Sequence, residues 1–388
     1  MKALTRVVKQ EAQRQGFALM GVTTPAPPAS FALFDQWLKD GCQAEMSYLA
    51  TERSRNLRSN PQAILPEARS ILMLALHYPS AELALPSNPF LPHDRTNGGL
   101  TSPPLTGKIA AYACGSDYHD ILPRRLAALA SFIAEHSPAA ISQRWYTDTG
   151  AVLERDLAQR AGLGWIGKNG CLIHPAHGSY TLLAEIFSAA ELTPDEAFVQ
   201  DRCGSCTRCI QACPTACIHP ERTVDSRRCL AYLNIELKGS IPRDLRPAMR
   251  DWVFGCDICQ QVCPWNKHRA GEVQEGKVDL IQEMTFGLTA TPQAFNLKYK
   301  NTPIKRAKRR GYLRNVAVCL GNSADPQAIP ILSQTLGQEG EALIRAHAAW
   351  ALGNIGGSQA HQSLENARRT EPDASVLQDI NCALEGNI

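Results

Sequence analysis

Residues 203–214 read CGSCTRCIQACP, with four cysteines spaced C-x2-C-x2-C-x3-C and a proline directly after the last one. Three thiolates at such short spacings can surround one 4Fe–4S cluster, while the fourth reaches a second cluster. A partner run at residues 256–264 reads CDICQQVCP but lacks a leading cysteine, and Cys229, which lies between the two runs, is the natural substitute. Together the two runs predict a small domain built around two clusters.

Crossing of the clusters assigns the last cysteine of each run to the cluster of the other run. One cluster is therefore expected on Cys203, Cys206, Cys209 and Cys263. The other is expected on Cys213, Cys229, Cys256 and Cys259. The alternative is a pair of structural zinc sites, because repeated C-x2-C pairs also suit tetrahedral zinc. The four-cysteine run with its proline is much more specific than such a pair, so it favours iron–sulfur clusters.

The composition favours a reducing compartment. Of the 388 residues, 14 are cysteines, and nine of these fall between residues 203 and 263. A secreted disulfide scaffold would be shorter, with cysteines throughout and an apolar leader, whereas charges interrupt the apolar positions at the start of this chain. No apolar run is long enough to cross a membrane. The sequence therefore predicts a cytoplasmic protein with metal-binding cysteines.

The chain around the cysteines divides into two further parts, so the expected domains are residues 1–190, 191–270 and 271–388. The first is expected to be a mixed α/β domain, with a long loop over residues 79–107. Its predicted strands are residues 70–78, 108–114, 144–147 and 180–187, and its predicted helices are residues 121–135 and 148–161. The middle domain has too little apolar periodicity for a core of its own, so its clusters should contribute to its folding.

The third domain is predicted to consist of helical repeats. The Gly-Asn pairs at 321–322 and 353–354 close two similar helical stretches, at a spacing typical of helix-pair repeats. Eight basic residues without an acidic one precede and enter the first stretch: Lys298, Lys300, Lys305, Arg306, Lys308, Arg309, Arg310 and Arg314. Against a whole-chain charge of +3, this cluster is a candidate phosphate-binding surface, with Tyr299 and Tyr312 as stacking platforms. The alternative is a solvated basic face.

A second group of motifs lies in the first domain. YTDTG (146–150) ends a predicted strand, Glu154 follows, and GLGWIGKN spans residues 162–169. Together with the two cysteine runs, the displaced Cys229 and the C-terminal repeats, these motifs strongly resemble the epoxyqueuosine reductases. The resemblance covers nearly the whole chain and extends to MSYLA (46–50), DYH (117–119) and YLNIELKG (232–239).

The resemblance implies an α+β fold with an N-terminal cobalamin-binding domain, a bacterial ferredoxin-like domain holding two 4Fe–4S clusters, and C-terminal HEAT-like repeats that bind tRNA. It implies reductive removal of the epoxide oxygen of epoxyqueuosine at the wobble position of tRNA. Electrons would pass from an external low-potential donor through the clusters to cobalamin. The family's proton donor falls on Asp148; the alternative is that Asp148 caps the following helix.

Further cofactor contacts carry over from the family residue by residue. Besides Asp148, the residues expected near cobalamin are Arg58, Cys114, Lys168, Gly255, Cys256 and Asp257. For Lys168 the alternative is a contact with substrate. A surface arginine and a buried strand thiol are the alternatives for Arg58 and Cys114. His119 is expected to be a hydrogen-bonded histidine rather than an axial cobalt ligand.

Two competing functions differ in cofactor and substrate. Another cobalamin and iron–sulfur reductase, such as a reductive dehalogenase, would typically carry an export signal and lack the basic helical tail. A non-catalytic ferredoxin-type electron carrier would need only the middle domain. We expect an oxidoreductase that acts on tRNA, most simply as a monomer.

Overall fold

The computed structural model describes residues 2–78, 105–269 and 276–386, so most of the predicted loop at 79–107 lies outside the described residues. The described chain forms two compact units. The N-terminal unit contains residues 2–78, 116–227 and 258–269, and the C-terminal unit contains residues 105–115, 228–257 and 276–386. The cysteine-rich segment contributes residues to both units. Within the described residues, no helix is long and apolar enough to span a bilayer.

The N-terminal unit is built on a four-stranded antiparallel sheet in the order β1-β2-β7-β4. The strands are β1 (Leu19–Thr23), β2 (Ser70–His77), β7 (Thr181–Ser188) and β4 (Gln143–Tyr146). The predicted strands at 70–78, 144–147 and 180–187 are thus confirmed to within a residue or two. The central strand β7 pairs Glu185 with Met73 on one side and with Tyr146 on the other.

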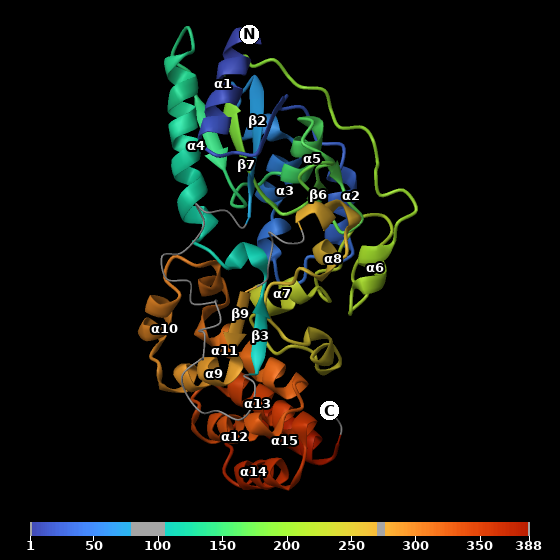
Figure 1. Cartoon of the computed structure of the whole chain (residues 1–388), viewed down its shortest axis with the longest axis vertical. Coiled ribbons are helices and arrows are strands. Elements are labelled where there is room, and N and C mark those ends of the chain that lie inside the picture. Colours follow the sequence, from blue (N-terminus) through green and yellow to red (C-terminus); the bar gives the residue numbers. More distant parts are fainter. Residues whose placement is uncertain (1, 79–104, 270–275, 387–388) are drawn as a thin grey trace. The chain divides into compact units, whose positions relative to one another are not determined.

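Helices cover both faces of this sheet (Figure 1). Two long helices, α1 (Lys2–Arg14) and α4 (Tyr118–Glu135), lie on one face, and α4 buries Leu122, Leu126, Leu129 and Ile133 at helical spacing. The shorter α5 (Glu154–Arg160) packs on the other face, in an apolar cluster that includes Leu157, Met73 and Phe187. The unit also contains α2 (Phe31–Lys39) and α3 (Glu52–Ser59).

The predicted helix at 148–161 begins six residues late. Asp148 has a φ of +55°, which a right-handed helix excludes for an L-residue, and Leu153 holds the N-cap position of α5. The alternative that Asp148 caps this helix is therefore wrong. Instead, residues 147–153 form an irregular turn between β4 and α5.

The cysteine-rich part of the N-terminal unit consists of short elements. A two-stranded hairpin, β5 (Trp165–Ile166) with β6 (Leu172–Ile173), carries the GLGWIGKN motif. Two short helices, α6 (Arg208–Ala212) and α8 (Ile258–Gln261), carry parts of the two cysteine runs. Such short elements bury little apolar surface, in keeping with the predicted lack of periodicity in this segment.

The C-terminal unit begins with a three-stranded sheet in the order β8-β3-β9. Its strands are β8 (Trp252–Phe254), β3 (Thr106–Ile109) and β9 (Gly276–Asp279), and a short helix α7 (Leu230–Ile235) accompanies them. The strand predicted over 108–114 is wrong in its second half, because β3 ends at Ile109 and a 3₁₀ turn follows at Ala111–Ala113.

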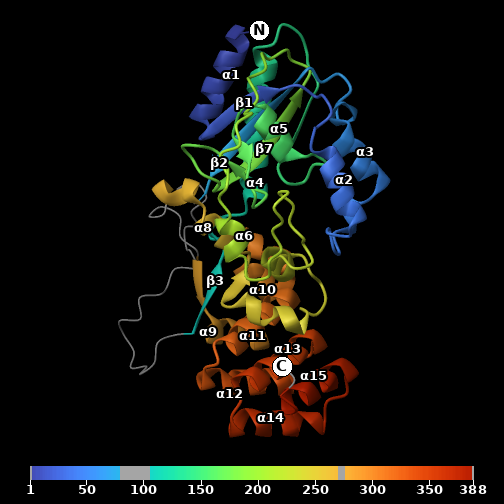
Figure 2. The ribbon, with the colours of Figure 1, turned by 90° about the vertical axis from the view of Figure 1, so that its right-hand side faces the viewer.

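The rest of the C-terminal unit is a stack of helices (Figures 1 and 2). They are α9 (Leu280–Thr289), α10 (Pro292–Lys298), α11 (Lys308–Asn322), α12 (Ile329–Gln338), α13 (Ala342–Ile355), α14 (Ser358–Arg368) and α15 (Ala374–Leu384). The repeated glycines lie where consecutive inner helices touch. A Cβ on Gly321 would stand 2.8 Å from Ala351 Cα, and one on Gly353 would stand 2.6 Å from Ala383 Cβ. The predicted helical repeats are confirmed.

Candidate active site and cluster site

Asp148 lies on the turn after β4 with its side chain 51% exposed. Its Oδ2 atom accepts a hydrogen bond from Tyr118 Oη at 2.7 Å and lies 3.7 Å from His119 Nε2. The His119 ring in turn contacts Asp117 Oδ1 through Nδ1 at 2.7 Å, so this histidine is hydrogen-bonded, as expected. The DYH motif at 117–119 thus orients a carboxylate that remains accessible to a substrate.

Two further carboxyl groups, those of Glu154 and Glu185, interact with Asp148. Glu154, the first residue of α5, accepts a hydrogen bond from the Asp148 backbone N–H at 2.8 Å. Burial raises the pKa of Glu154 to about 7, and the negative charge of Asp148 acts in the same direction. Glu185, in the middle of β7, is completely buried, and burial together with the charges of Glu154 and Asp148 raises its pKa well above the usual range.

Arg58 is buried against the turn that carries Asp148. Its guanidinium is only 8% exposed, bonds Ser54, and lies 3.5 Å from the Gly150 carbonyl oxygen. It also lies 5.6 Å from the centre of the Phe34 ring. The alternative of a surface arginine is therefore wrong, and Arg58 supports the turn that carries Asp148.

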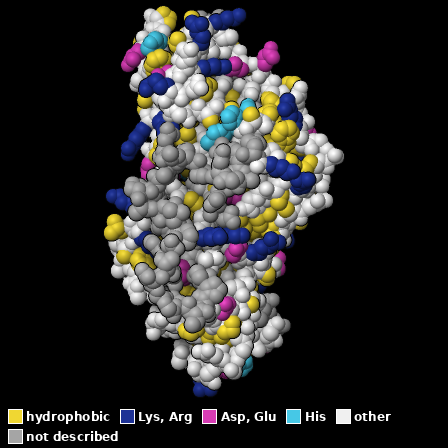
Figure 3. Space-filling view, viewed as in Figure 1, with side chains coloured by type: hydrophobic (Ala, Val, Ile, Leu, Met, Phe, Trp, Pro, Cys, Tyr) yellow, Lys and Arg dark blue, Asp and Glu magenta, His cyan; other side chains and the backbone are white. Residues whose placement is uncertain are grey.

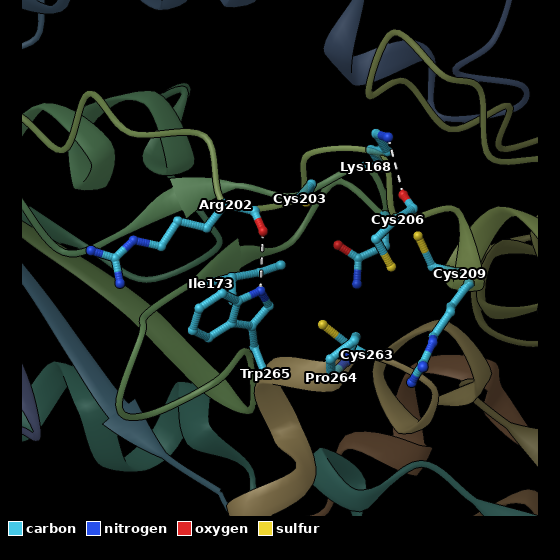
Figure 4. A pocket seen from close by; sticks show the side chains of 11 residues that line it. Lys168, Ile173, Arg202, Cys203, Cys206, Cys209, Cys263, Pro264 and Trp265 are labelled. Atoms are coloured by element: carbon cyan, nitrogen blue, oxygen red, sulfur yellow. Dashed lines mark hydrogen bonds between the residues drawn. The ribbon is translucent and has the colours of Figure 1, made fainter.

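Four of the predicted cluster ligands line one cavity. Cys203, Cys206, Cys209 and Cys263 surround a hollow of about 270 Å³ in the N-terminal unit. Figure 4 shows the thiols of Cys206, Cys209 and Cys263 pointing toward the same space. A set of four cysteine sulfurs around such a hollow is the donor set of a 4Fe–4S cluster. The residues present thus fit the first cluster.

The GLGWIGKN hairpin lies against this cavity. Trp165 Nε1 donates to Cys203 Sγ at 3.3 Å, and Lys168 Nζ donates to the carbonyl oxygens of Gly204 and Cys206 at 2.8 and 3.0 Å. N–H donors to the ligand sulfurs are among the factors that set the potential of such clusters. Lys168 therefore contacts the loop that carries Cys203 and Cys206. The sequence did not predict the hydrogen bond from Trp165 to Cys203.

The second predicted ligand set draws on both units. Cys213 and Cys259 belong to the N-terminal unit, and Cys229 and Cys256 belong to the C-terminal unit. Cys213 Sγ lies 3.4 Å from Cys217 Sγ, and this hydrogen bond lowers the pKa of the Cys213 thiol to about 5. The thiolate is the form that binds iron. The identity of this second set stays a prediction.

The predicted cobalamin contacts of the C-terminal unit meet at one turn. Asp257 Oδ2, in a side chain that is almost fully buried, accepts a hydrogen bond from Ala111 N at 2.7 Å. Gly255 has a φ of +68°, and a Cβ there would stand 2.5 Å from Ala110 Cβ. The half-buried Cys114 lies on the same turn, with its Sγ 3.4 Å from the Ala110 carbonyl oxygen. The structure thus brings Cys114, Gly255 and Asp257 together.

The basic cluster divides into exposed and buried members. Arg314 is fully buried and donates to the carbonyl oxygens of Leu233, Leu237 and Gly239, so its prediction as a nucleic-acid contact is wrong. Tyr299 and Tyr312 are also fully buried, and their predicted role as stacking platforms is wrong. The spacing of residues in the sequence did not show that these three positions lie in the core of the helical repeats and not on their surface.

Two other members of the basic cluster, Lys298 and Arg309, form ion pairs. Lys298 lies 2.7 Å from Glu283, and Arg309 lies 2.5 Å from Glu339. The exposed members are Lys300, Lys305, Arg306, Lys308 and Arg310. On the face drawn in Figure 3, Lys and Arg side chains are dispersed among acidic and neutral ones, in keeping with the small net charge.

Four cysteines around one cavity, four more that are predicted to hold a second cluster, an accessible acid and helical repeats are together typical of an iron–sulfur oxidoreductase. Comparison with known proteins narrows this class. Residues 202–266 match the 4Fe-4S double cluster binding domain, residues 58–149 match the family model "Epoxyqueuosine reductase QueG, DUF1730", and residues 307–385 match HEAT repeats.

Curated relatives match along most of the chain. The epoxyqueuosine reductase of Pseudomonas aeruginosa is 35% identical over 90% of this chain and 94% of its own length. That of Escherichia coli is 34% identical over 91% of this chain and 89% of its own. The chain therefore belongs to the epoxyqueuosine reductase family, whose members are oxidoreductases.

Solved structures agree with this assignment. An epoxyqueuosine reductase crystallised with an epoxyqueuosine-modified tRNA-Tyr stem loop has a TM-score of 0.85 at 28% identity, over 99% of this chain and 98% of that one. The Bacillus subtilis enzyme, with its catalytic aspartate loop swung out of the active site, has a TM-score of 0.82 at 27% identity, over 99% of both chains. The expected fold, α+β with a double-cluster domain and C-terminal HEAT repeats, is confirmed.

Proposed function

We propose that this chain reduces the epoxide of epoxyqueuosine in tRNA to the cyclopentenediol of queuosine, with Asp148 supplying a proton. The observation that carries the proposal is the accessible Asp148 carboxylate, held by Tyr118 at 2.7 Å on a turn with a left-handed backbone. Family membership supplies the substrate, because the curated relatives carry this activity in their names. An epoxide oxygen leaves far more readily once it is protonated.

The Asp148 turn is the counterpart we assign to the catalytic aspartate loop of the Bacillus subtilis enzyme, which has been seen swung out of its active site. A φ of +55° at a non-glycine residue is a strained conformation. The turn is tied down by the Tyr118 and Glu154 hydrogen bonds, which a swing of Asp148 would exchange for contacts with substrate.

Cobalamin and two 4Fe–4S clusters are the proposed cofactors. Cys203, Cys206, Cys209 and Cys263 would hold the first cluster, and Cys213, Cys229, Cys256 and Cys259 the second. Cys114, Gly255, Cys256 and Asp257 would contact cobalamin; what supports this is that the hydrogen bond of Asp257 to Ala111 N and the close approach of Gly255 to Ala110 bring these residues to the turn that carries Cys114. When bound, cobalamin supplies a strongly reducing metal centre for opening the epoxide.

We propose that the exposed basic residues Lys300, Lys305, Arg306, Lys308 and Arg310 contact the tRNA backbone. A tRNA substrate also supports action in the cytoplasm. The electrons are assigned to an external low-potential donor, and a monomer is the simplest assembly.

The decisive experiment is anaerobic incubation of the purified protein with a chemical reductant, cobalamin and epoxyqueuosine-containing tRNA, followed by nucleoside analysis. We expect queuosine to form only when cobalamin and reductant are both present. Failure to form queuosine while the iron content stays near eight atoms per chain would contradict the proposal. Iron without corrinoid binding would favour an electron carrier, and zinc in place of iron would remove the redox function altogether.

A further inference from the structure

The cavity proposed to hold the first cluster lies close to the protein surface. Two of its lining side chains, Arg202 and Arg208, are exposed, and so are Gly204, Ser205 and Thr207 of the same loop. A Cβ on Gly204 would meet no described atom within 4 Å, so this part of the loop is open to solvent. Because electron transfer slows steeply with distance, a cluster in this cavity would be well placed to receive electrons from a partner protein.

The side chains that line this cavity include three cations, Lys168, Arg202 and Arg208, and no acid; we call these three the basic rim. Within the described part of the chain, none of the three forms an ion pair. Lys168 donates to two backbone carbonyl oxygens, which leave its charge uncompensated. The one acid of the adjoining loop, Asp201, is paired with Arg222 at 2.5 Å. The basic rim therefore carries a local excess of positive charge.

A small apolar patch borders the basic rim. The Arg202 guanidinium lies 5.4 Å from the centre of the Phe198 ring and 5.9 Å from that of Trp265. Figure 4 shows this guanidinium pointing away from the cavity. Val199, next to Phe198 in the chain, is 84% exposed. An exposed apolar side chain beside uncompensated cations is the composition of a protein-binding surface.

This surface fits an acidic protein better than a nucleic acid. Three cations beside an apolar patch match a partner with a few carboxylates around its own apolar contact, whereas nucleic-acid sites need more cations. Electron-transfer complexes are small, and charges at their rim mainly raise the rate of association. Compensation of the negative thiolates accounts for Lys168, which is bonded to the cysteine loop, but not for the outward-pointing Arg202.

We propose that the basic rim, with Val199 at its apolar edge, is the docking surface for a small acidic protein that carries single electrons at low potential. The inference rests on the proposed function, which needs an external electron donor. At each encounter the carrier is oxidised by one electron and the first cluster is reduced by one. Two encounters supply the two electrons that, together with two protons, convert the epoxide to an alkene and water.

The test measures how fast a reduced acidic ferredoxin reduces the clusters of the full-length holoprotein, followed as the bleaching of cluster absorption after rapid mixing. Arg202→Glu combined with Arg208→Glu reverses two charges of the basic rim. Lys2→Glu combined with Arg6→Glu is the matched control, because both residues are exposed cations of α1 in the same unit. Reduced methyl viologen, a small cation that needs no docking surface, is the second reductant. All proteins are compared at equal iron content.

For the rim variant we expect the second-order rate constant with ferredoxin to fall by about tenfold or more at low ionic strength, because the steering charges are reversed. The wild-type rate should fall as salt is added, and that of the rim variant should not. The control should keep the wild-type rate. Methyl viologen should reduce the rim variant at least as fast as wild type.

An unchanged ferredoxin rate in the rim variant would overturn the proposal, and so would an equal loss in the control, which would mean that only the net charge matters. An equal loss with methyl viologen would mean that these cations act on the cluster itself, and the docking surface would again be rejected. Weaker tRNA binding together with an unchanged ferredoxin rate would assign the basic rim to the RNA instead.

Should the rim variant fail to hold iron, Ser205→Glu carries the same test, because it adds a negative charge at an exposed position of the loop and removes no described side-chain contact. We expect the ferredoxin rate of this variant to fall by about threefold or more. If wild type forms no queuosine with a chemical reductant, the proposed function fails, while the reduction rates still decide whether the basic rim binds an acidic carrier.

Discussion

In the C-terminal unit, the fully buried guanidinium of Arg314 meets three backbone carbonyl oxygens, whereas in the N-terminal unit the equally buried carboxyl of Glu185 meets no polar partner among the described residues. Both side chains cost free energy when they leave water. Only that of Arg314 is compensated by hydrogen bonds. The difference separates a buried charge that stabilises the fold from a buried carboxyl group, with a raised pKa, that the fold only tolerates.

Other buried charged side chains of the C-terminal unit also have partners, as Arg314 does. Arg246 lies 3.2 Å from Asp379, and the Glu339 and Glu371 carboxylates are paired with Arg309 and Arg345. Pairing of this kind is expected where a charge has a structural role. A titratable group that stays buried without a partner, close to an accessible acid, is more often found at an active site. The comparison therefore supports the proposal that Asp148, in the N-terminal unit, is the acid of the reaction.

The largest effect is expected for Asp148→Asn, which tests the functional side of the comparison. The amide keeps the size of the side chain and can still accept from Tyr118 Oη, but it cannot donate the proton of an acid. We expect queuosine formation to fall by about 10²- to 10⁴-fold, the usual contribution of a general acid. Iron content and cobalamin binding, measured by absorption spectra, should not change. Wild-type activity in this variant would remove Asp148 from the mechanism.

The second-largest effect tests whether Arg314 stabilises the fold. Arg314→Met fills much of the same volume but leaves the carbonyl oxygens of Leu233, Leu237 and Gly239 without their donor. We expect the free energy of unfolding to fall by about 3–5 kcal/mol, as when one partner of a buried charged network is removed. Denaturant titration measures this loss. The matched control Lys305→Ala, at an exposed position close by, should change stability by no more than about 0.5 kcal/mol.

A smaller effect is expected from the exposed cations. Replacing Lys300, Lys305, Arg306 and Lys308 by Ala should weaken tRNA binding and reduce the slope of log affinity against log salt by about one per lost phosphate contact. Arg309→Ala serves as the comparison, because its guanidinium is bonded to Glu339 and the Gly287 carbonyl oxygen; it should cost stability more than binding. Unchanged affinity in the fourfold variant would contradict the proposed tRNA surface.

The sequence predicted those features that depend on local pattern. Cysteine spacing identified the thiols that line the cluster cavity, and the paired Gly-Asn repeats identified the helices that pack through Gly321 and Gly353. Features that depend on tertiary packing were not predictable in this way. Arg314 belongs to a basic run but points into the core, and nothing in YTLLAEIF at residues 180–187 marks Glu185 as more than one polar residue in a strand.

The smallest effect concerns the pH dependence of stability. The pKa of Glu154 rises from the ordinary 4.5 to about 7 on folding, so between these values the folded state binds a proton that the unfolded state releases. The free energy of unfolding should therefore fall as pH rises through this interval.

Glu185, whose pKa is also raised, adds to the same slope. Glu154→Gln keeps the acceptor for the Asp148 backbone N–H but does not titrate. The fall in the free energy of unfolding between pH 5 and pH 8 should therefore be smaller than in wild type by about 1–3 kcal/mol. Urea titrations at several pH values measure the change. Glu371→Gln should act in the opposite sense: burial notwithstanding, Arg345 lowers the pKa of Glu371, and the stability it provides is lost as pH falls. An unaltered slope in Glu154→Gln would mean that its carboxyl is ionised throughout, and the contrast with the paired carboxylates of the helical repeats would then no longer hold.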